Sequence, residues 1–584
     1  MIRIFKSIYE NLNKKLKKSL FILIFLSILI PVLEMAGVAI IIPIIQISLN
    51  SLNMSNSIFS NIIENFFKEQ PSQETVSYFL VLIIFIFFIF KSIFLILSEK
   101  FKLKFFKMIQ DEFSIKLYNY YIYSNYEKFS KYQFTEKNRN VGNVGVLTNY
   151  LKNINEIVVA IFFFIFIFTF LLIYNFKVSL FIFFLFFVIS VIIYLSSGTK
   201  LLKYSKISHA QNAKMVGNLL NVFYSIKEVI ILKRRLIFQK KFSESFMLLT
   251  KSTYKDGLIK FFPRIIFELL LISIILLIVI FLIYKKQSIA NNLEFIGVFT
   301  LATLKVSLSA NKILLAFQNL KSIKIPAEEI SNELSSLPDN KNENPSIEDH
   351  SNMKINFSDR IKLKNVYFKY LANGDNTLEN INLEIEKNSI IGIFGPSGGG
   401  KTTLINLILG FLKPSSGQIC VDDFDTSKNV PLWQNSLAYV PQDIFLFNDT
   451  IKNNILFGLN ENDITENDIK RVTKLVNLDE FLNRVESGLN TVVGEKATRL
   501  SGGQAQRISI ARSILRGSEI VVLDEATSKL DENNEYKILE SITKKLSNSK
   551  TFIIISHRSN TLKKFCDKVF ELSNNKLVLK YQKN

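Results

Sequence analysis

Long apolar runs in the first half of the chain constrain its fold more than any other feature. There are six, and the last is the weakest because it contains Lys305 and Lys312. A bilayer offers no partner to an unpaired backbone N–H or C=O group, so runs of about twenty apolar residues favour membrane-spanning helices. We therefore predict an all-α, six-span transmembrane domain over residues 1–333. The runs are Leu20–Leu49, Val76–Leu97, Ile157–Tyr174, Val178–Leu195, Ile265–Tyr284 and Phe295–Leu315.

Basic residues are distributed unevenly around these runs. Lys and Arg number 71 against 50 Asp and Glu, which gives a net charge of +21. They crowd residues 1–19, 98–156 and 196–262, whereas residues 50–75 contain more acids than bases. Lys and Arg are retained on the cytoplasmic side of membranes. The pattern therefore predicts that both termini are cytoplasmic, and it accounts for the charge without a nucleic-acid partner.

Three segments outside the runs are also predicted to be helical. Residues 55–68 place isoleucine and phenylalanine on one helical face, which predicts an amphipathic helix on the outer membrane surface or one that caps the protein's own core. The two long basic segments exceed simple turns, so we expect helices that continue into the cytoplasm. Their tips, Tyr126–Phe129 and Ser225–Glu228, are candidate contacts with the following domain.

A G-x-x-x-x-G-K-T motif organises the second half of the chain. Its glycines allow a tight turn with inward-pointing N–H groups, and a helix that follows the turn adds positive potential, so the motif suits phosphate binding. Lys401 would reach the β- and γ-phosphates of ATP, and Thr402 would hold Mg²⁺. The predicted cofactor-binding residues are Gly395, Pro396, Ser397, Gly398, Gly399, Gly400, Lys401, Thr402 and Thr403.

Two acids end a later buried-strand pattern. Asp524 suits Mg²⁺, and Glu525, which points elsewhere on a strand, suits a base that polarises the attacking water. Before them, a Leu-Ser-Gly-Gly-Gln stretch opens a helix and forms a second anion site through Ser501, Gly502, Gly503 and Gln504. The chain thus has two anion sites, the phosphate loop and this stretch, but binds one nucleotide. We therefore infer that the second site closes on ATP held by another chain, and we expect a homodimer.

The sequence changes character after the transmembrane domain. Residues 334–352 are polar and predict a linker, and residues 353–584 alternate strand and helix patterns as in an α/β domain. The predicted fold class is therefore multidomain: an all-α six-span membrane domain and an α/β P-loop ATP-binding domain. The two cysteines, Cys420 and Cys566, have no metal-ligand spacing and suit a reducing cytosol.

The phosphate loop, residues 500–504 and the two acids, in this order, resemble the ATP-binding cassette of ABC transporters. The resemblance covers residues 361–574, and the six-span domain ahead of it resembles the exporter type of half-transporter. It implies an ATP hydrolase coupled to transport across a membrane. Since both acids, Lys401 and His557 are present, the resemblance implies an active ATPase.

The resemblance also implies roles for residues outside these motifs. Tyr370 would stack on adenine, Gln442 would contact Mg²⁺ and water, and His557 would contact the γ-phosphate. Asp531 would take part in the contact across the dimer, and Thr491–Glu495 resembles the exporter loop that faces the coupling helices. Two positions depart from the family pattern: Lys529 replaces the usual alanine, and Ala497 replaces the usual glycine.

The membrane domain resembles, more specifically, the bacterial flippase of lipid-linked oligosaccharides. This implies transport of an undecaprenyl-pyrophosphate oligosaccharide from the inner to the outer leaflet of the bacterial inner membrane. Exporters of lipid A, other lipids or hydrophobic drugs are the alternatives, and an ATP-gated channel or regulator is a further one. The resemblance rests on Glu34, residues 55–68, Pro263-Arg264 with Glu268, Ser309–Lys312 and Leu446–Ile451.

Four cations at membrane depth require a reason, because charge is costly there. Lys305 and Lys312 are seven residues apart and share a helical face, Lys91 lies in the second run, and Arg264 directly precedes the fifth. They could snorkel to the inner headgroups or pair locally, as Arg264 could with Glu268. Alternatively, the four form a basic path for a pyrophosphate headgroup.

Overall fold

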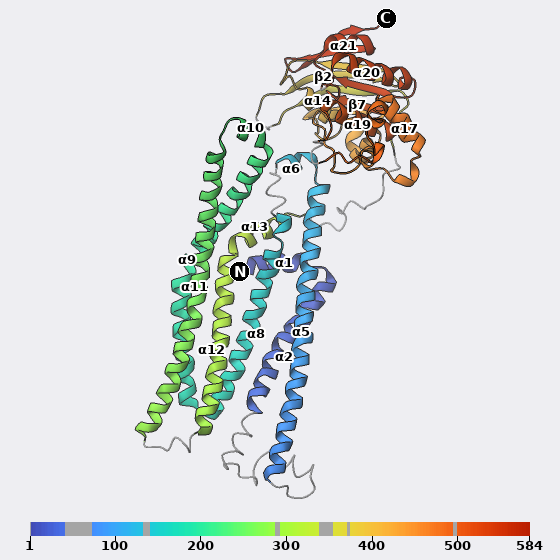
Figure 1. Cartoon of the computed structure of the whole chain (residues 1–584). Coiled ribbons are helices and arrows are strands. Elements are labelled where there is room, and N and C mark those ends of the chain that lie inside the picture. Colours follow the sequence, from blue (N-terminus) through green and yellow to red (C-terminus); the bar gives the residue numbers. More distant parts are fainter. Residues whose placement is uncertain are drawn as a thin grey trace. The chain divides into compact units, whose positions relative to one another are not determined.

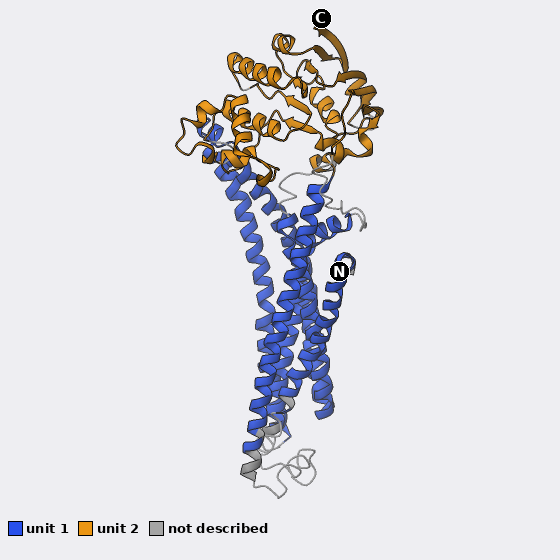
Figure 2. Cartoon of the chain, turned by 90° about the vertical axis from the view of Figure 1, so that its right-hand side faces the viewer, with its two compact units in different colours: residues 1–124, 132–339 blue, residues 125–131, 340–584 orange. Residues whose placement is uncertain are grey.

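The computed structural model describes residues 2–40, 73–131, 140–285, 293–337, 354–370, 374–494, 499–528 and 530–583. Within it the chain divides into two compact units (Figure 2). Unit 1 comprises residues 1–124 and 132–339, and unit 2 comprises residues 125–131 and 340–584. The predicted amphipathic helix at 55–68, Ala497, Lys529 and most of the predicted linker lie outside the described residues. The predicted domain limits at 333 and 353 stay predictions.

Unit 1 is built from helices, and six of those described are long and apolar enough to cross a membrane. Figure 1 shows them running alongside one another. The six are α2 (Lys14–Ala39), α5 (Gln73–Tyr123), α8 (Gly145–Tyr174), α9 (Phe176–Tyr224), α11 (Arg235–Tyr284) and α12 (Leu293–Ser322). Shorter helices are α1 (Ile2–Asn11), α10 (Ile226–Ile231) and α13 (Lys324–Ser335). The predicted all-α, six-span architecture is confirmed.

Three of these helices extend far beyond their apolar runs. α5, α9 and α11 contain 51, 49 and 50 residues, and at 1.5 Å per residue each is about 75 Å long. A helix that crosses the hydrocarbon core of a bilayer needs to be only about 30 Å long. The expectation that the long basic segments continue as helices is therefore met by the structure.

Aromatic and aliphatic side chains hold the membrane helices of unit 1 together. Phe186 of α9 contacts Phe267 of α11 with ring centroids 5.7 Å apart, and both are buried.

The turn between α8 and α9 is fixed by Asn175, whose Oδ1 accepts from the N–H of Val178 and so caps α9. Ser179 Oγ donates to the carbonyl of Leu171 at the end of α8 (2.7 Å). These two hydrogen bonds join the end of α8 to the start of α9.

Unit 2 is an α/β domain with two sheets, as the sequence predicts. The larger sheet has the order β10-β9-β3-β8-β7-β6, in which neighbours are parallel except β10 and β9. Its strands are β3 (Ile390–Phe394), β6 (Leu437–Val440), β7 (Ile520–Asp524), β8 (Thr551–Ile555), β9 (Lys568–Ser573) and β10 (Lys576–Gln582). The smaller, antiparallel sheet contains β2 (Leu378–Glu386), β1 (Arg360–Phe368), β4 (Ser416–Val421) and β5 (Phe424–Asp425), in that order.

Helices complete unit 2 around its larger sheet. Every residue of β7 and β8 is buried, as expected for central parallel strands covered on both faces. Ligands of such sheets bind beyond the carboxyl ends of the strands, where β3 and β7 end. The helices are α14 (Lys401–Ile408), α15 (Val430–Asn435), α16 (Ile451–Ile455), α17 (Glu466–Leu475), α18 (Asp479–Leu482), α19 (Gly502–Leu515), α20 (Glu532–Leu546) and α21 (Ser559–Phe565).

The short helix α6 (Tyr126–Lys131), one of the two predicted tip contacts, is also part of unit 2. The ring of Tyr126 lies 5.0 Å from that of Phe411, and Phe411 lies 6.4 Å from Tyr439 of β6. The other tip, Ser225–Glu228, is in unit 1 at the start of α10, and its predicted contact stays a prediction.

Candidate functional site

The phosphate loop joins β3 to α14, and its glycines are required by its geometry. A Cβ on Gly395 would lie 2.2 Å from the carbonyl oxygen of Leu572, so only glycine fits. Gly398 and Gly400 have φ angles of 80° and 92°, in the left-handed region that glycine adopts freely. Gly400 is the N-cap of α14, and no side chain caps that helix end. The loop thus leaves N–H groups at a helix N-terminus, a geometry that fits phosphate oxygens.

Lys401 is the first residue of α14, and its side chain is folded over the loop. Its Nζ donates to the carbonyls of Gly395 and Pro396, both at 2.9 Å, and the residue is 7% exposed. The loop therefore positions the ammonium group against its own backbone. Beside it, Thr402 is exposed and Thr403 is buried. Both threonines lie in the first turn of α14, as the motif predicts.

Tyr370 lies next to the loop although it is far away in sequence. Its hydroxyl forms a 3.0 Å hydrogen bond with the hydroxyl of Thr403. Its ring packs edge-on against Phe368 of β1, and 62% of the residue is exposed. An exposed aromatic ring beside a phosphate loop is suited to stacking on a nucleotide base. The predicted adenine contact is therefore compatible with its position.

Asp524 ends β7 and is held by a residue that the sequence motifs did not identify. The hydroxyl of Tyr439, on the neighbouring strand β6, donates to Asp524 Oδ2 at 3.3 Å. Burial raises the pKa of Asp524 to about 6, and the hydrogen bond from Tyr439 partly opposes this rise. The one available signal was position, because Tyr439 lies three residues before Gln442. Lys401, at the start of α14, also lowers the pKa of Asp524 by its charge, and a buried carboxylate near that lysine is a suitable ligand for Mg²⁺.

Glu525 is the centre of a three-residue cluster. Gln442 Nε2 donates to its Oε2 at 2.7 Å, and His557 Nε2 lies 2.7 Å from its Oε1. Glu525 has a φ angle of 49°, which is uncommon for a residue with a side chain and recurs at functional sites. It is 8% exposed, whereas the His557 side chain is half exposed. The structure therefore brings together the three predicted catalytic residues.

The second anion site lies at the start of α19. Ser501 Oγ accepts from the N–H of Gln504, and Gln504 Oε1 accepts from the N–H of Ser501, so the two residues form a capping box. Asp531 caps α20 by accepting from Asn534, whose side chain lowers the pKa of this carboxyl. A cavity of about 370 Å³ is lined by Ser501, Gly502, Gly503, Gln504 and Asp531, among others.

This cavity contains polar groups but is not lined by the phosphate loop. Arg484 and Arg507 also line it, as does Glu480, which pairs with Arg484 at 3.9 Å, so Arg507 is the cation that adds to the positive N-terminus of α19. None of its described lining residues comes from Gly395–Thr402. That the two anion sites of one chain serve different nucleotides stays a prediction.

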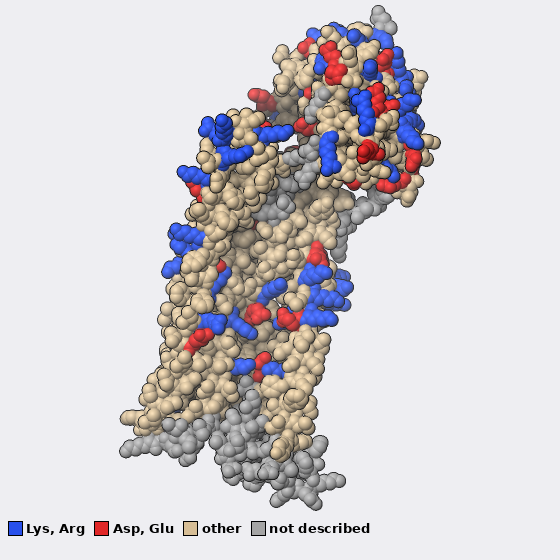
Figure 3. Space-filling model, viewed as in Figure 1, with Lys and Arg blue, Asp and Glu red and all other residues tan. Residues whose placement is uncertain are grey.

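The predicted cations of unit 1 separate into two groups. Lys91 Nζ and Lys305 Nζ both lie 3.0 Å from Glu34 Oε2, so α2, α5 and α12 meet in one charge cluster. Arg264 instead pairs with Glu268 on its own helix at 2.9 Å, and both side chains are exposed. Lys312 is exposed. On the face shown in Figure 3, the charged side chains of unit 1 gather in groups separated by uncharged surface.

Comparison with known proteins identifies the domain that carries the nucleotide site. Residues 378–528 match the family model of ABC transporters. The lipid A-core flippase of Pectobacterium atrosepticum is 38% identical over 219 residues, which are 37% of this chain and 37% of the flippase. HepA of Nostoc, a heterocyst differentiation ATP-binding protein, is 43% identical over 220 residues, which are 37% of this chain and 35% of HepA. Unit 2 thus contains an ABC-type ATP-binding domain.

The whole chain has a solved structural counterpart. A bacterial Atm1-family ABC exporter with ATP bound superposes with a TM-score of 0.73 over 97% of this chain and 95% of the exporter, at 18% identity. The fold is therefore that of an ABC exporter half-transporter. The sequence relatives, in contrast, are matched over little more than a third of their length.

Proposed function

We propose that this protein is one half of an ATP-driven exporter that functions as a homodimer in the bacterial inner membrane. The exporter fold along the whole chain, combined with the Gln442–Glu525–His557 cluster, is the observation that supports this proposal. An ATP-binding regulator or gated channel would not require a strained glutamate held between two polar partners. In this proposal both termini lie in the cytoplasm, where ATP is available.

In the proposed cycle ATP binds along the phosphate loop, where loop N–H groups and Lys401 hold the phosphates. Thr402, Gln442 and Asp524 are the residues suited to hold Mg²⁺, which would neutralise phosphate charge. Glu525 accepts a proton from the attacking water. His557 and Gln442 fix the Glu525 carboxylate, because each contacts one of its two oxygens. Tyr370 stacks on adenine.

The second half of each ATP site comes from the partner chain. In the proposed dimer, Ser501, Gly502, Gly503 and Gln504 of one chain close on the phosphates bound by the other, with Asp531 at the same interface. The polar cavity around Ser501 supports this, since none of its described lining residues comes from the phosphate loop of the same chain. Closure of two such sites would drive the membrane domains between their two arrangements.

We further propose that the cargo is a lipid with a phosphate-containing headgroup, most specifically an undecaprenyl-pyrophosphate oligosaccharide moved from the inner to the outer leaflet. The Lys91–Glu34–Lys305 cluster supports an anionic cargo. Two lysines share one carboxylate there, so among the described residues the cluster carries one positive charge more than its single acid balances. A phosphate could take the place of Glu34 on Lys305, the more exposed of the two lysines.

A lipid A-type cargo is the second candidate. The 38% identity to a lipid A-core flippase favours it, and its phosphates would make the same contacts. ATPase activity in proteoliposomes distinguishes the candidates. We expect stimulation by polyprenyl-pyrophosphate oligosaccharide, and not by unphosphorylated polyprenol. Stimulation by lipid A alone would replace the first cargo by the second.

The cations can be tested in the same assay. We expect Lys305→Ala with Lys312→Ala, and separately Arg264→Ala, to lose cargo stimulation and flipping while basal hydrolysis persists. Lys324→Ala, an exposed lysine paired with Glu328 on α13, is the matched control. If all of the cation variants flip cargo at the parent rate, these cations do not bind cargo, and their role is to anchor the helices at the membrane interface.

A further inference from the structure

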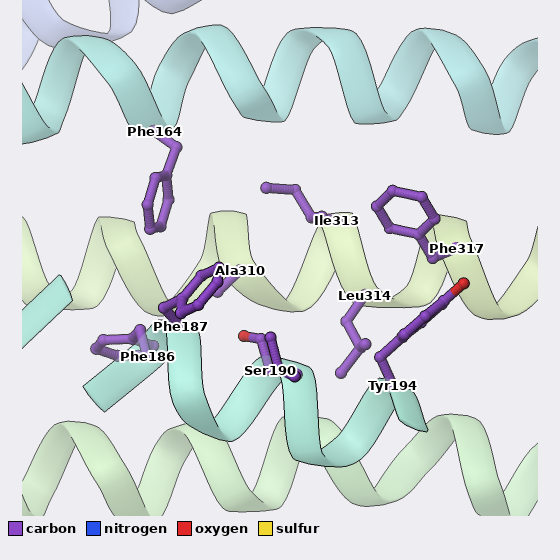
Figure 4. A pocket seen from close by; sticks show the side chains of 10 residues that line it. Phe164, Phe186, Phe187, Ser190, Tyr194, Ala310, Ile313, Leu314 and Phe317 are labelled. Atoms are coloured by element: carbon purple, nitrogen blue, oxygen red, sulfur yellow. The ribbon is translucent and has the colours of Figure 1, made fainter. Parts of the chain in front are cut away.

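Unit 1 contains an apolar cavity that lies apart from its charge cluster. The cavity has a volume of about 430 Å³, which is within the range of small-molecule sites, and it is lined by residues of α8, α9 and α12. Figure 4 shows Phe164 pointing from α8 toward α12, with Phe186 and Phe187 near it. Tyr194 and Phe317 lie together at the opposite end, with ring centroids 5.8 Å apart. All three helices are among the six able to cross a membrane.

The lining of the cavity is almost wholly hydrocarbon. Besides the aromatic rings, Ala310, Ile313 and Leu314 of α12 face it, and Ser190 contributes the hydroxyl nearest its middle. At membrane depth such a space is dry, and a hydrocarbon chain can fill it. Lipid chains are as apolar as the lining, so the hydrophobic effect gives no preference for one lipid over another. Any selectivity must come from an end of the cavity.

A cation lies at the Tyr194 end. Lys321 is one helical turn beyond Phe317, and its Nζ lies 5.4 Å from the centroid of the Tyr194 ring. The ammonium group also lies against Gly198 of α9, where a Cβ would be in ordinary van der Waals contact with Nζ at 3.6 Å. The apolar lining ends at this level, where Gln318 Nε2 donates to Ser197 Oγ. The apolar cavity therefore has polar groups and one cation just beyond its Tyr194 end.

The acid that contacts the next residue of α12, Ser322, is already paired with a lysine of its own helix. Asp256 of α11 accepts from Ser322 Oγ at 2.6 Å, but it also forms a 2.5 Å salt bridge with Lys260. Within the described part of the chain, no carboxylate oxygen lies within the 4.0 Å of a salt bridge to Lys321 Nζ. A cation of this kind at the end of an apolar cavity can bind an anionic headgroup.

We propose that the cavity between α8, α9 and α12 binds one hydrocarbon chain of an anionic membrane phospholipid, with the headgroup at Lys321. α12 ends at Ser322 and leads toward the ATP-binding domain, so in the proposed topology this end faces the cytoplasm. The headgroup then lies in the inner leaflet and the chain extends toward the middle of the bilayer. The inference rests on the proposed topology, and it is independent of the proposed cargo.

A tryptophan reporter can detect a lipid chain in the cavity. The protein contains a single tryptophan, Trp433, which is fully buried in unit 2 and donates to the carbonyl of Ile408. Its fluorescence supplies a constant reference signal. Phe164→Trp places a second reporter in the cavity. Phe184→Trp, at a residue of α9 that is 60% exposed and does not line the cavity, reports on the surrounding bilayer.

Both proteins are placed in nanodiscs of phosphatidylcholine with increasing fractions of a brominated lipid, which quenches nearby tryptophan. We expect brominated phosphatidylglycerol to quench Phe164→Trp at about a fivefold lower fraction than brominated phosphatidylcholine, since one lysine contributes about 1 kcal/mol toward anionic lipid. Phe184→Trp should show no such preference. Neither ATP nor cargo is present, so failure of the proposed transport activity would leave this result unaffected.

Substitutions then locate the headgroup. Lys321→Gln should abolish the anionic preference of Phe164→Trp, whereas Lys200→Gln, an exposed lysine of α9 close to Gly198, should preserve it. Ala310→Leu should fill the cavity and reduce quenching by both lipids. Absence of quenching at Phe164→Trp would show that protein, such as a second copy of the chain, covers the cavity, and would overturn the proposal. Equal quenching by both lipids, or a preference that survives Lys321→Gln, would also overturn it.

Discussion

Tyr439 donates a hydrogen bond to Asp524 across two adjacent strands of the larger sheet, and this contact connects the proposed magnesium ligand to the rest of unit 2. Tyr439 is also packed edge-on against Phe411, which lies against Tyr126 of α6. A shift of α6 therefore has a direct route to the carboxylate that is proposed to hold Mg²⁺. The route contains two aromatic contacts and one hydrogen bond.

Tyr439→Phe tests this contact through the pH dependence of ATP hydrolysis. The pKa of Asp524 is raised to about 6 by burial, and the hydrogen bond lowers it. Mg²⁺ needs the ionised carboxylate, so activity should fall as the pH falls through 6. Removing the hydroxyl should raise the pH at which activity falls by about 1 unit, since a hydrogen bond to a charged group contributes about 1.5 kcal/mol.

The measurement is the Mg²⁺ concentration for half-maximal ATPase activity between pH 5.5 and 8. Tyr439→Phe should need more Mg²⁺ than the parent at pH 6.5, and the difference should shrink toward pH 8. Tyr581→Phe, on strand β10 at the opposite edge of the same sheet, is the control. Identical Mg²⁺ curves for the parent and Tyr439→Phe would show that the hydroxyl does not tune Asp524.

Glu525→Gln should separate nucleotide binding from hydrolysis. The amide can still accept from Gln442, but it cannot accept a proton from water, so hydrolysis should fall by about a hundredfold or more. ATP affinity should change little, because Lys401 and the loop amides are untouched. Glu532→Gln, an exposed residue in the first turn of α20, is the control. Hydrolysis at the parent rate would exclude Glu525 as the base.

Glu34→Gln should destabilise the membrane domain by leaving two lysines without their shared carboxylate. Lys91 is 8% exposed, and removing one partner of a buried ion pair costs about 3–5 kcal/mol. The Tm of the purified protein should fall, and Lys91→Met in the same chain should recover most of the loss. Glu328→Gln, whose pair with Lys324 is half exposed, should have little effect. If Lys91→Met gives no recovery, the cluster is not held by charge balance.

Most of the nucleotide site was predictable from sequence because its chemistry depends on local spacing. The G-x-x-x-x-G-K-T motif fixes a turn and a helix start, and both occur in the structure. Tyr439 was not predictable, because its partner Asp524 is 85 positions away and only strand pairing brings them together. The shared carboxylate of Lys91 and Lys305 was missed for the same reason: each residue lies on a different helix. Hydropathy located the six spans but could not reveal the cavity at Tyr194, which depends on how three helices pack.

Pairwise complementation tests the composite sites of the proposed homodimer. A mixed dimer of one Lys401→Ala chain and one Ser501→Ala chain has one site with both changes and one site with neither. Placing both changes in one chain, with an unchanged partner, damages each site once. If the sites are composite, the first dimer should bind ATP normally at one site and the second at none. Separately tagged, co-purified dimers allow both to be measured by ATP binding and single-turnover hydrolysis. The same ATP binding in both arrangements would show that each chain forms its site alone, and the cavity at Ser501 would then need another ligand.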